Sequence, residues 1–372
     1  MEDRIYIVGA HSRAQTFVEY LRLLYPETGV EAFLYDNEES NPEKIGMTPV
    51  LQMDGELKLN FDCPVYIATR GIYHEKLAGR LKEMGFREIR PVTPALDIRL
   101  RNAYVKKYYA CRRQAFLKLE ELGTGGSARA GKTVRSDLEI AGKLESAVYV
   151  VRSIFDKPLR HPYLLASYER EIQAGAALTG ERLYPDVFTD DTGDNISDRN
   201  KQFCELTALY WIWKQAREGI VGLAHYRRHF ILPEDWELRM RDNQVDVVLP
   251  VPLYVAPSLA INFKSRHSFL EWDCMMDCLK ERNVLECREA ENFFRGNLYS
   301  PCNMFIMRRE ALNDLCGWLF PVLFCVADHI GWKEDGYQNR YPGFLSERLI
   351  SFFFEKNREK YKVAYADKNF LA

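Results

Sequence analysis

A polar stretch in the middle of the chain gathers carboxylates and amides directly before an apolar helix pattern. Residues 190–197 read DDTGDNIS, and CELTALYWIW follows at 204–213. This places oxygen ligands and hydrogen-bond acceptors at one end of a buried helix, which Asp194 or Ser197 could equally cap. The side chains concerned are Asp190, Asp191, Asp194, Asn195, Asn200 and Glu205.

Polar side chains also follow strand patterns in the second half of the chain. Residues 220–224, IVGLA, run into HYRRH at 225–229, and Asn303 opens the apolar segment 303–307. The segment GFLSERL at 343–349 places Glu347 near the start of the last helix. Open α/β sheets bind ligands where their strands end, so we expect these positions to share one ligand-binding edge.

The elements that must position these residues form two α/β regions. Strand and helix patterns alternate over 4–98, and a second set begins with a strand at 147–151 and a helix over 163–177. A glycine-rich linker at 123–131 separates them. We expect a Rossmann-like parallel-sheet domain over 1–98, a basic helix and linker over 99–146, and an α/β domain over 147–372.

The first domain carries only part of a dinucleotide-binding fingerprint. Gly9 follows the strand at 5–8 without the other two glycines of that motif. Asp36 ends the second strand, where an acidic side chain could meet a ribose. A cofactor site and a domain that binds no ligand both remain open.

Residues 99–122 are predicted to form one long helix with a basic surface. Seven Lys or Arg residues and no acid occur between 99 and 118, interleaved with tyrosines. The helix could be a solvated connection between the domains. Alternatively it could contact anionic lipid headgroups, to which each basic residue adds about 1 kcal/mol.

Composition describes a globular protein, with 47% hydrophobic residues and a formal net charge of -2. Such a balance does not suit a disordered chain or a dedicated nucleic-acid binder. We expect no signal peptide and no membrane span, because the longest apolar runs, 318–326 and 349–354, are short. The nine cysteines form no CxxC pair, which predicts free thiols in a reducing cytoplasm and makes a zinc site unexpected.

Five motifs of the second half agree in order with a known family. They are DDTGDNIS, CELTALYW, GLAHYRR, NMFIM and GFLSERL. Over residues 147–357 the chain resembles the bacterial capsular and exopolysaccharide glycosyltransferase family catalogued as domain of unknown function 4422. One departure is that family members usually end their first strand with a His-Lys pair, whereas VRSIFDK stands here at 151–157.

The resemblance implies a GT-A-like enzyme that transfers a hexose from a nucleotide sugar. The donor would be linked to uridine diphosphate, with a galactose-type sugar favoured. The acceptor would be a growing surface polysaccharide or a lipid-linked oligosaccharide, and the enzyme would be cytoplasmic. Peripheral contact with the inner membrane face through 99–118 is an alternative that rests on the basic composition of that stretch, which lies outside the resemblance. No nucleic-acid partner is expected.

The residues suit that role chemically. Arginine donates two parallel hydrogen bonds to a diphosphate and keeps its charge, although Arg227 and Arg228 could also pair with surface acids. His225 and His229 have the spacing of a helical metal pair, but they flank a strand end. Glu347 could be the base for the acceptor hydroxyl, a ligand of sugar hydroxyls, or only a favourable charge at the helix start.

The implied site therefore divides into two groups. The expected catalytic residues are Glu347, Arg227 and His225. The expected donor-binding residues are Asp190, Asp191, Asp194, Asn195, Asn200, Glu205, Arg228, Asn303 and Arg348. No tightly bound cofactor is expected, and a role for manganese or magnesium, with Asp190, Asp191 and Asp194 as the reserve ligands, is open.

Two other functions compete with glycosyl transfer. A nucleotide-sugar oxidoreductase or epimerase would need a working fingerprint in the first domain, which Gly9 to Ala14 does not supply. A non-catalytic scaffold of a polysaccharide assembly complex could use the same fold without turnover.

Overall fold

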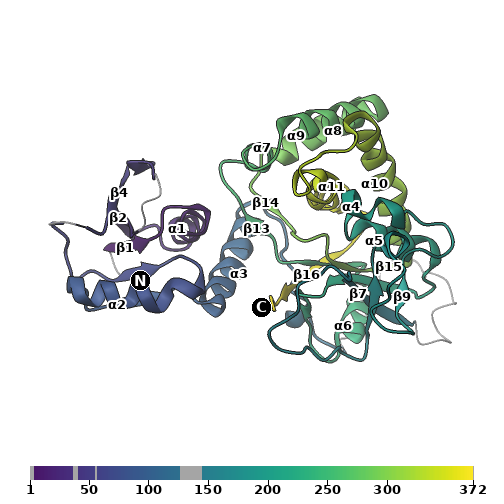
Figure 1. Ribbon diagram of the computed structural model, residues 1–372. Helices are drawn as coiled ribbons and strands as arrows, with labels where there is room; N and C mark the ends of the chain where they lie inside the picture. Colours follow the sequence, from purple (N-terminus) through teal and green to yellow (C-terminus); the bar gives the residue numbers. More distant parts are fainter. Residues whose placement is uncertain (1–3, 37–40, 55–56, 126–144, 372) are drawn as a thin grey trace. The chain divides into compact units, whose positions relative to one another are not determined.

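A computed structural model describes residues 4–36, 41–54, 57–125 and 145–371 (Figure 1). The chain divides into two compact units, residues 1–116 and 117–372, and each combines a β-sheet with helices. The predicted α/β class is therefore confirmed. Residues 126–131 of the expected linker lie outside the described residues.

The first unit is built on a sheet in the order β3-β4-β2-β1-β5-β6. All neighbouring pairs are parallel except β3 with β4, which is antiparallel at one edge. Its elements are β1 (Arg4–Val8), α1 (Ser12–Leu24), β2 (Gly29–Tyr35), β3 (Lys44–Ile45), β4 (Thr48–Gln52), β5 (Val65–Ile67), α2 (His74–Met84) and β6 (Ile89–Pro91).

The helices α1 and α2 cover opposite faces of this sheet. Phe17 of α1 packs on Tyr66 with ring centroids 5.3 Å apart. Leu77 and Leu81 of α2 join the apolar cluster that contains Val65 and Ile67. Successive residues of a strand point to opposite faces of the sheet, so Tyr66 points to one face and Val65 and Ile67 point to the other. The helices that contact them, α1 and α2, therefore lie on different faces.

The predicted helix over 99–122 is wrong at both ends. The helix α3 (Pro94–Cys111) starts earlier, because Thr93 accepts a hydrogen bond from the backbone of Leu96 and Pro94 occupies the first turn. It ends at Cys111, and Arg113 has a left-handed backbone with φ of 58°.

The basic residues of 99–118 do not share one solvated surface. Arg101 and Tyr104 are buried within the first unit. Lys118 belongs to the second unit, where it is buried and forms a salt bridge with Asp367 at 2.7 Å. Membrane contact through this stretch stays a prediction, and it would use only part of the stretch.

The second unit contains an eight-stranded mixed sheet in the order β11-β16-β12-β15-β10-β7-β8-β9. The strands β10, β7, β8 and β9 run parallel, so their carboxyl ends meet at one edge. The strands are β7 (Ser146–Arg152), β8 (Glu169–Gln173), β9 (Phe188–Thr189), β10 (Ile220–His225), β11 (Phe230–Ile231), β12 (Val247–Pro250), β15 (Phe305–Arg308) and β16 (Val363–Lys368), with a separate pair β13 (Leu253–Tyr254) and β14 (Leu298–Tyr299).

Helices α8 to α11 gather on one side of this sheet and α6 lies on the other (Figure 1). The helices are α4 (Asn200–Phe203), α5 (Leu206–Gln215), α6 (Trp236–Asp242), α7 (Leu259–Lys264), α8 (Phe269–Arg282), α9 (Val284–Phe294), α10 (Arg309–Ile330) and α11 (Tyr341–Lys356). By length and composition α10 could span a membrane. Its apolar face is buried against α8, α11 and α5, as in a helix of a protein core.

Two further expectations are wrong in this unit. Residues 163–177 do not form a helix, because residues 169–173 pair as β8 with β7 and tertiary pairing overrides their helix propensity. The cysteines are not all free, since Cys278 and Cys325 form a disulfide.

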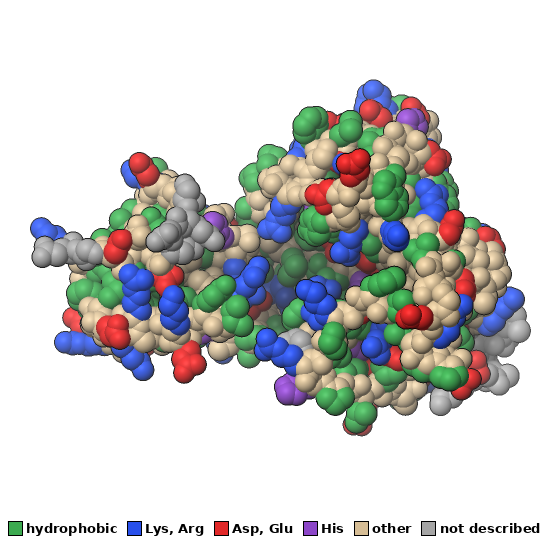
Figure 2. Space-filling view, viewed as in Figure 1, with side chains coloured by type: hydrophobic (Ala, Val, Ile, Leu, Met, Phe, Trp, Pro, Cys, Tyr) green, Lys and Arg blue, Asp and Glu red, His purple; other side chains and the backbone are tan. Residues whose placement is uncertain are grey.

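Charges of both signs are interspersed over the face shown in Figure 2. This distribution matches the net charge of -2.

We predict that Lys118→Met destabilises the second unit by about 3 kcal/mol, because it removes the buried ammonium group that forms a salt bridge with the Asp367 carboxylate. Urea denaturation measures the change. The control is Lys280→Met at an exposed position of α8, which should change stability by less than about 0.5 kcal/mol. Equal stability of the two variants would contradict this role for the buried pair.

Candidate active site

A cavity of about 180 Å³ lies in the second unit, where the end of β10, the turn before β15 and the start of α11 meet. It is lined by Cys204, Glu205, His225, Arg228, Cys302, Arg340, Gly343, Phe344 and Glu347. These residues come from four segments that are far apart in the sequence. The fold therefore brings four of the five sequence motifs, or their immediate neighbours, to one place.

The backbone at this cavity is unusual. Cys204, Cys302 and Asn303 have φ of 51°, 75° and 51°, a left-handed conformation that residues other than glycine seldom adopt. Each such residue costs about 1 kcal/mol or more and persists only where its surroundings hold it. Strain of this kind is concentrated at functional sites, and here it lies on two of the cavity's segments.

Glu347 is held in place but keeps free lone pairs. Its Oε1 accepts from the backbone N–H of Cys302 at 2.6 Å, and its Oε2 accepts from Arg348 at 2.9 Å. A carboxylate offers about four lone-pair positions, so about half remain for a ligand in the cavity. Burial raises the pKa of Glu347, against the opposing effects of Arg348 and the Cys302 N–H.

Arg348 lies behind Glu347 and does not line the cavity. Its guanidinium is 4.4 Å from the ring centroid of Tyr299 and 5.5 Å from that of Phe263. The side chain is buried, and one nitrogen also donates to the carbonyl of Phe344 at 3.0 Å. The structure therefore gives Arg348 a positioning contact with Glu347 and no direct access to a donor in this cavity.

His225 is fixed by the tight turn that follows β10. Its backbone N–H donates to the carbonyl of Arg228 at 3.0 Å, and the Arg228 N–H donates back at 2.9 Å. The ring Nε2 donates to the carbonyl of Cys302 at 2.5 Å, because a carbonyl can only accept. Burial lowers the pKa of His225, which favours the neutral ring with its lone pair on Nδ1.

Asn303 connects three segments beneath the cavity. Its amide donates to Glu205 at 2.8 Å and to the carbonyl of Gly343 at 3.0 Å. Ser346 donates to the Asn303 oxygen at 2.8 Å. Asn303 is buried, so it fixes the orientation of Glu205 and the start of α11.

Two guanidinium groups balance the two carboxylates of the cavity. Arg228 lies over the ring of Phe370 at 5.3 Å from its centroid, and Arg340 donates to the sulfur of Cys204 at 3.0 Å. Both line the cavity together with Glu205 and Glu347. A ligand that carries an anionic group and hydroxyls would find partners for both.

Arg227 points elsewhere. It donates to the carbonyl of Lys157 at 3.3 Å and packs over the ring of Tyr226 at 5.1 Å from the centroid. Of the two adjacent arginines, Arg228 lines the cavity. The sequence could not distinguish them, because the turn at 225–228 decides which side chain faces inward.

Asp190 has a structural role that the sequence did not reveal. The carboxylate is fully buried and accepts from the backbone N–H groups of Gly175 and Ala176 at 2.9 and 3.0 Å. It also accepts from the hydroxyls of Ser197 and Thr207. Four donors occupy all of its lone-pair positions, so it cannot also bind a cation or a sugar.

The other residues of the polar loop are also committed to local contacts. Asp191 forms a salt bridge with Arg182 at 3.0 Å, and Asp194 pairs with Lys214 at 3.3 Å. Asn195 accepts from the backbone of Ser197, and Asn200 donates to Thr207. Among the described residues, the three aspartates do not form a cluster that could hold a cation.

Three further lining residues, Arg340, Cys302 and Cys204, were not among the predicted site residues. Cys204 begins the motif CELTALYW, Cys302 directly precedes NMFIM, and Arg340 lies three residues before GFLSERL, so proximity to a motif was the available signal. Cys302 and Cys204 contribute through their backbone conformation, which their side-chain type does not predict.

The first unit has a cavity of its own, of about 730 Å³. It lies at the carboxyl ends of β1 and β5, beside the start of α1 and Asp36. Gly9 has φ of 112°, and a Cβ there would lie 3.2 Å from Thr69, so the turn needs glycine. Lys76 and Arg80 pair with Asp36 at 3.5 and 3.8 Å, which gives this acid partners other than a ribose.

We predict that Asp190→Asn destabilises the second unit by about 2–4 kcal/mol, because the amide nitrogen meets buried donors and leaves one unpaired. Chemical denaturation monitored by circular dichroism measures this. Asp194→Asn, at an exposed position of the same loop, is the control and should cost less than about 0.5 kcal/mol. A fully stable Asp190→Asn protein would show that the buried carboxylate is not needed for folding.

Comparisons with known proteins agree with this architecture. The chain is similar to the apo structure of WbbM, a bifunctional glycosyltransferase, with a TM-score of 0.53 and 24% identity over 61% of this chain and 45% of that chain. The chain thus matches less than half the length of that protein, and the likeness shows the fold. A likeness to core-mannan synthase A of Aspergillus fumigatus in its Mn/GDP form, at TM-score 0.27, 11% identity and coverage of 69% and 80%, is too weak to argue from.

No curated protein matches the chain. The family model described as Domain of unknown function (DUF4422) matches residues 157–358, which is more than half of the 372 residues. All five motifs, which span residues 190–349, fall within the same range. The chain therefore belongs to the DUF4422 family.

Proposed function

We propose that the second unit is a glycosyltransferase that uses a nucleotide sugar. The observation that carries the proposal is the convergence of Glu347, Glu205, His225 and Arg228 on one cavity. The likeness of the fold to a glycosyltransferase structure supports it. In a direct displacement, a base takes the proton of the acceptor hydroxyl and cations stabilise the departing diphosphate, and the cavity offers groups for both tasks.

Glu347 is the base in this proposal. Its free lone pairs face the cavity, and its raised pKa makes it a better proton acceptor than an ordinary carboxylate. Arg348 and the Cys302 N–H keep the carboxylate oriented toward the acceptor hydroxyl. Glu205, oriented by Asn303, binds sugar hydroxyls.

Arg228 and Arg340 stabilise the negative charge that develops on the diphosphate as the sugar leaves. Arginine suits this task because its planar group donates two parallel hydrogen bonds. His225, neutral and fixed by Cys302, can accept a hydrogen bond from a hydroxyl through Nδ1. A divalent cation could share the charge of the diphosphate, and whether one does is a question for chelation.

The finer assignment rests on the sequence motifs. We propose a GT-A-like enzyme whose donor is a hexose linked to uridine diphosphate, with galactose as the first sugar to test. The proposed acceptor is a growing surface polysaccharide or a lipid-linked oligosaccharide at the cytoplasmic face of a membrane. Incubation with a panel of nucleotide sugars, with the release of free uridine diphosphate as the readout, would test which donor is used. The absence of turnover with every donor would favour a non-catalytic scaffold.

The cavity of the first unit favours a second, separate role. Its lining includes Arg13, Arg70 and Lys76, so it suits a phosphate-bearing ligand. The turn at Gly9 lacks the remaining fingerprint glycines, which argues against a dinucleotide oxidoreductase. A ligand of this cavity would bind equally well to a Glu347→Gln protein, which distinguishes it from a donor bound in the second unit.

We predict that Glu347→Gln lowers turnover by about 10²-fold or more while donor binding changes little, because the amide keeps the shape but cannot take a proton. In the wild type, kcat should fall on the acid side with a midpoint at a pH above the ordinary pKa of glutamic acid. Activity falls as the pH drops through the raised pKa, since only the ionised carboxylate accepts the proton.

Glu355→Gln, two turns further along α11, is the matched control and should retain wild-type turnover. Calorimetry with the donor separates binding from turnover. Wild-type kcat in the Glu347→Gln protein would exclude Glu347 as the base, whatever the control does.

We predict that Arg228→Lys raises the KM for the donor at least tenfold, because lysine keeps the charge and loses the two-pronged geometry. Arg227→Lys should have a smaller effect, since Arg227 donates to a backbone carbonyl outside the cavity. Initial rates at varied donor concentration, before and after chelation of divalent ions, measure both. The reverse order of effects would assign the diphosphate to Arg227.

A further inference from the structure

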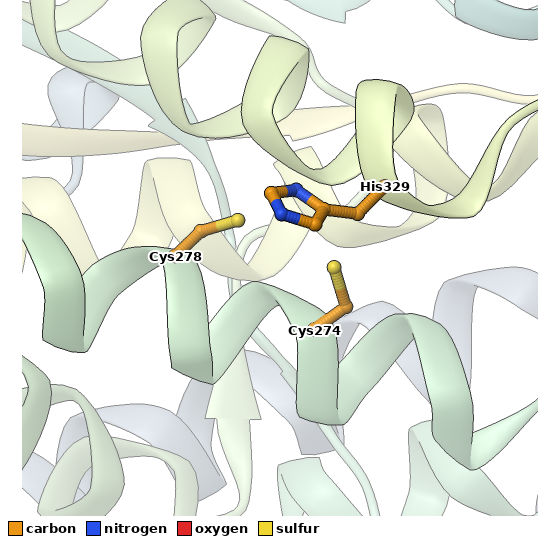
Figure 3. Close-up of side chains that lie close together, drawn as sticks. All are labelled: Cys274, Cys278 and His329. Carbon is orange, nitrogen blue, oxygen red and sulfur yellow. The ribbon is translucent and has the colours of Figure 1, made fainter.

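Two packed helices of the second unit bring four metal-binding side chains together. Cys274 and Cys278 lie one turn apart on α8, and Cys325 and His329 lie one turn apart near the end of α10. Residues four apart share one face of a helix, and α8 packs against α10. The two pairs therefore face each other across the helix contact. Figure 3 shows Cys274 and Cys278 of α8 opposite His329 of α10.

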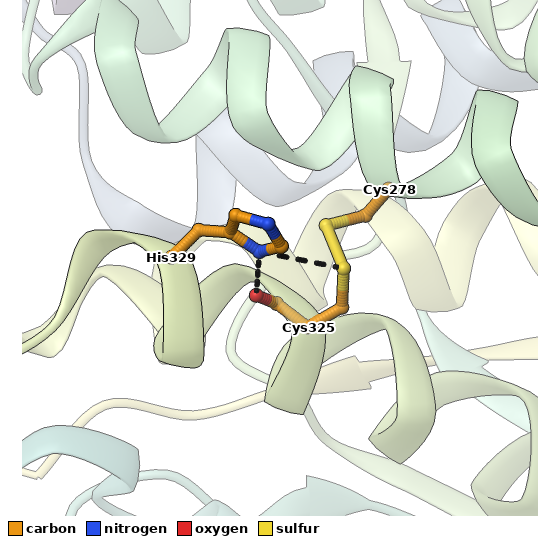
Figure 4. Close-up of a disulfide and its surroundings, with 3 residues drawn as sticks. All are labelled: Cys278, Cys325 and His329. Carbon is orange, nitrogen blue, oxygen red and sulfur yellow. Dashed lines mark hydrogen bonds between the residues drawn. A yellow bond between two sulfur atoms is a disulfide. The ribbon is translucent and has the colours of Figure 1, made fainter.

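The distances suit one metal ion. The ligand atoms of Cys274, Cys278 and His329 lie within 4.8 Å of one another. The sulfur of Cys325 is bonded to that of Cys278 and lies 3.8 Å from Nδ1 of His329, the ring nitrogen turned away from the metal position (Figure 4). A tetrahedral zinc ion with zinc–sulfur bonds of about 2.3 Å separates its ligand atoms by about 3.5–3.8 Å. Once the disulfide is broken, rotation of the cysteine side chains can move the two bonded sulfurs apart to that spacing.

The histidine is oriented as a metal ligand usually is. Nδ1 of His329 donates to the carbonyl of Cys325 at 2.8 Å, since a carbonyl can only accept. The neutral ring then carries its lone pair on the other nitrogen. Metal-binding histidines commonly use one nitrogen for the metal and the other for such a backbone contact.

We propose that Cys274, Cys278, Cys325 and His329 form a zinc site of the Cys₃His type when the Cys278–Cys325 disulfide is reduced. Reduction by a dithiol adds two electrons and two protons, breaks the sulfur–sulfur bond and leaves two thiols, while the dithiol becomes a disulfide. Zinc then binds three thiolates and the imidazole, and the three thiol protons are released. The disulfide and the zinc site are alternative states of the same side chains.

Zinc is the metal that this ligand set favours. Soft thiolates with one imidazole in tetrahedral geometry are typical of zinc, whereas magnesium and manganese prefer oxygen ligands. Four protein ligands leave no open position for a substrate, so the site is structural. It joins α8 to the end of α10, directly before the segment 331–340 that leads to Arg340 of the cavity.

Metal content of the full-length protein tests the proposal. Protein reduced with a phosphine, freed of metal by a chelator and then given zinc should bind one zinc per chain, measured by mass spectrometry of the metal. Cobalt in place of zinc should give the visible absorption bands of a tetrahedral thiolate site. Protein whose disulfide is intact should bind no zinc at these residues.

Cys274→Ser is the deciding variant, because it removes a zinc ligand and leaves both disulfide partners in place. Its zinc affinity should fall by more than about 100-fold, beyond the loss typical of an outer-shell change. Cys111→Ser, at an exposed thiol of the first unit, is the control and should bind zinc as the wild type does. Wild-type affinity in a folded Cys274→Ser protein, or no zinc in folded and reduced wild type, would overturn the proposal.

Discussion

The buried carboxylate of Asp190 is the interaction on which the site's position depends. It accepts hydrogen bonds from the turn at Gly175 and Ala176, from Ser197 and from Thr207 of α5. These contacts tie the end of β8 to the start of α5, directly beside Glu205. A buried carboxylate without hydrogen-bond donors would lower the stability of the fold by several kcal/mol. The charge of Asp190 therefore depends on the four donors, and the loop conformation is what brings these donors to it.

The same count of donors separates a carboxylate that is saturated within the protein from one that can still bind a ligand. Asp190 uses all of its lone-pair positions within the protein, whereas Glu347 uses about half and lines a cavity. Both are acids of polar motifs in the second half of the chain, Asp190 directly after β9 and Glu347 in the second turn of α11, and the sequence gives no sign of the difference. Only the three-dimensional arrangement of donors shows which of them can still meet a ligand.

Patterns that repeat along one strand or helix could be predicted from the sequence, and contacts across the fold could not. The apolar runs at β7, β10 and β15 are strands, because apolar residues with strand propensity need only a neighbouring strand. The helix predicted over 163–177 does not form, because the pairing of 169–173 with β7 outweighs the local helix propensity. Arg228 rather than Arg227 lines the cavity because of a turn whose geometry no single residue type dictates.

The size of the cavity limits how a donor can lie in it. At about 180 Å³ it falls below the 300–1,000 Å³ that is typical of sites enclosing a whole small ligand. A nucleotide sugar would therefore place only its reacting end among Glu347, Glu205 and Arg228. The nucleoside would have to extend along the open edge where β10, β7 and β8 end in parallel, as ligands of α/β sheets do. This edge includes the end of β7 at Arg152. For the proposed donor, differences in the base would therefore act at this edge, and differences in the sugar would act in the cavity.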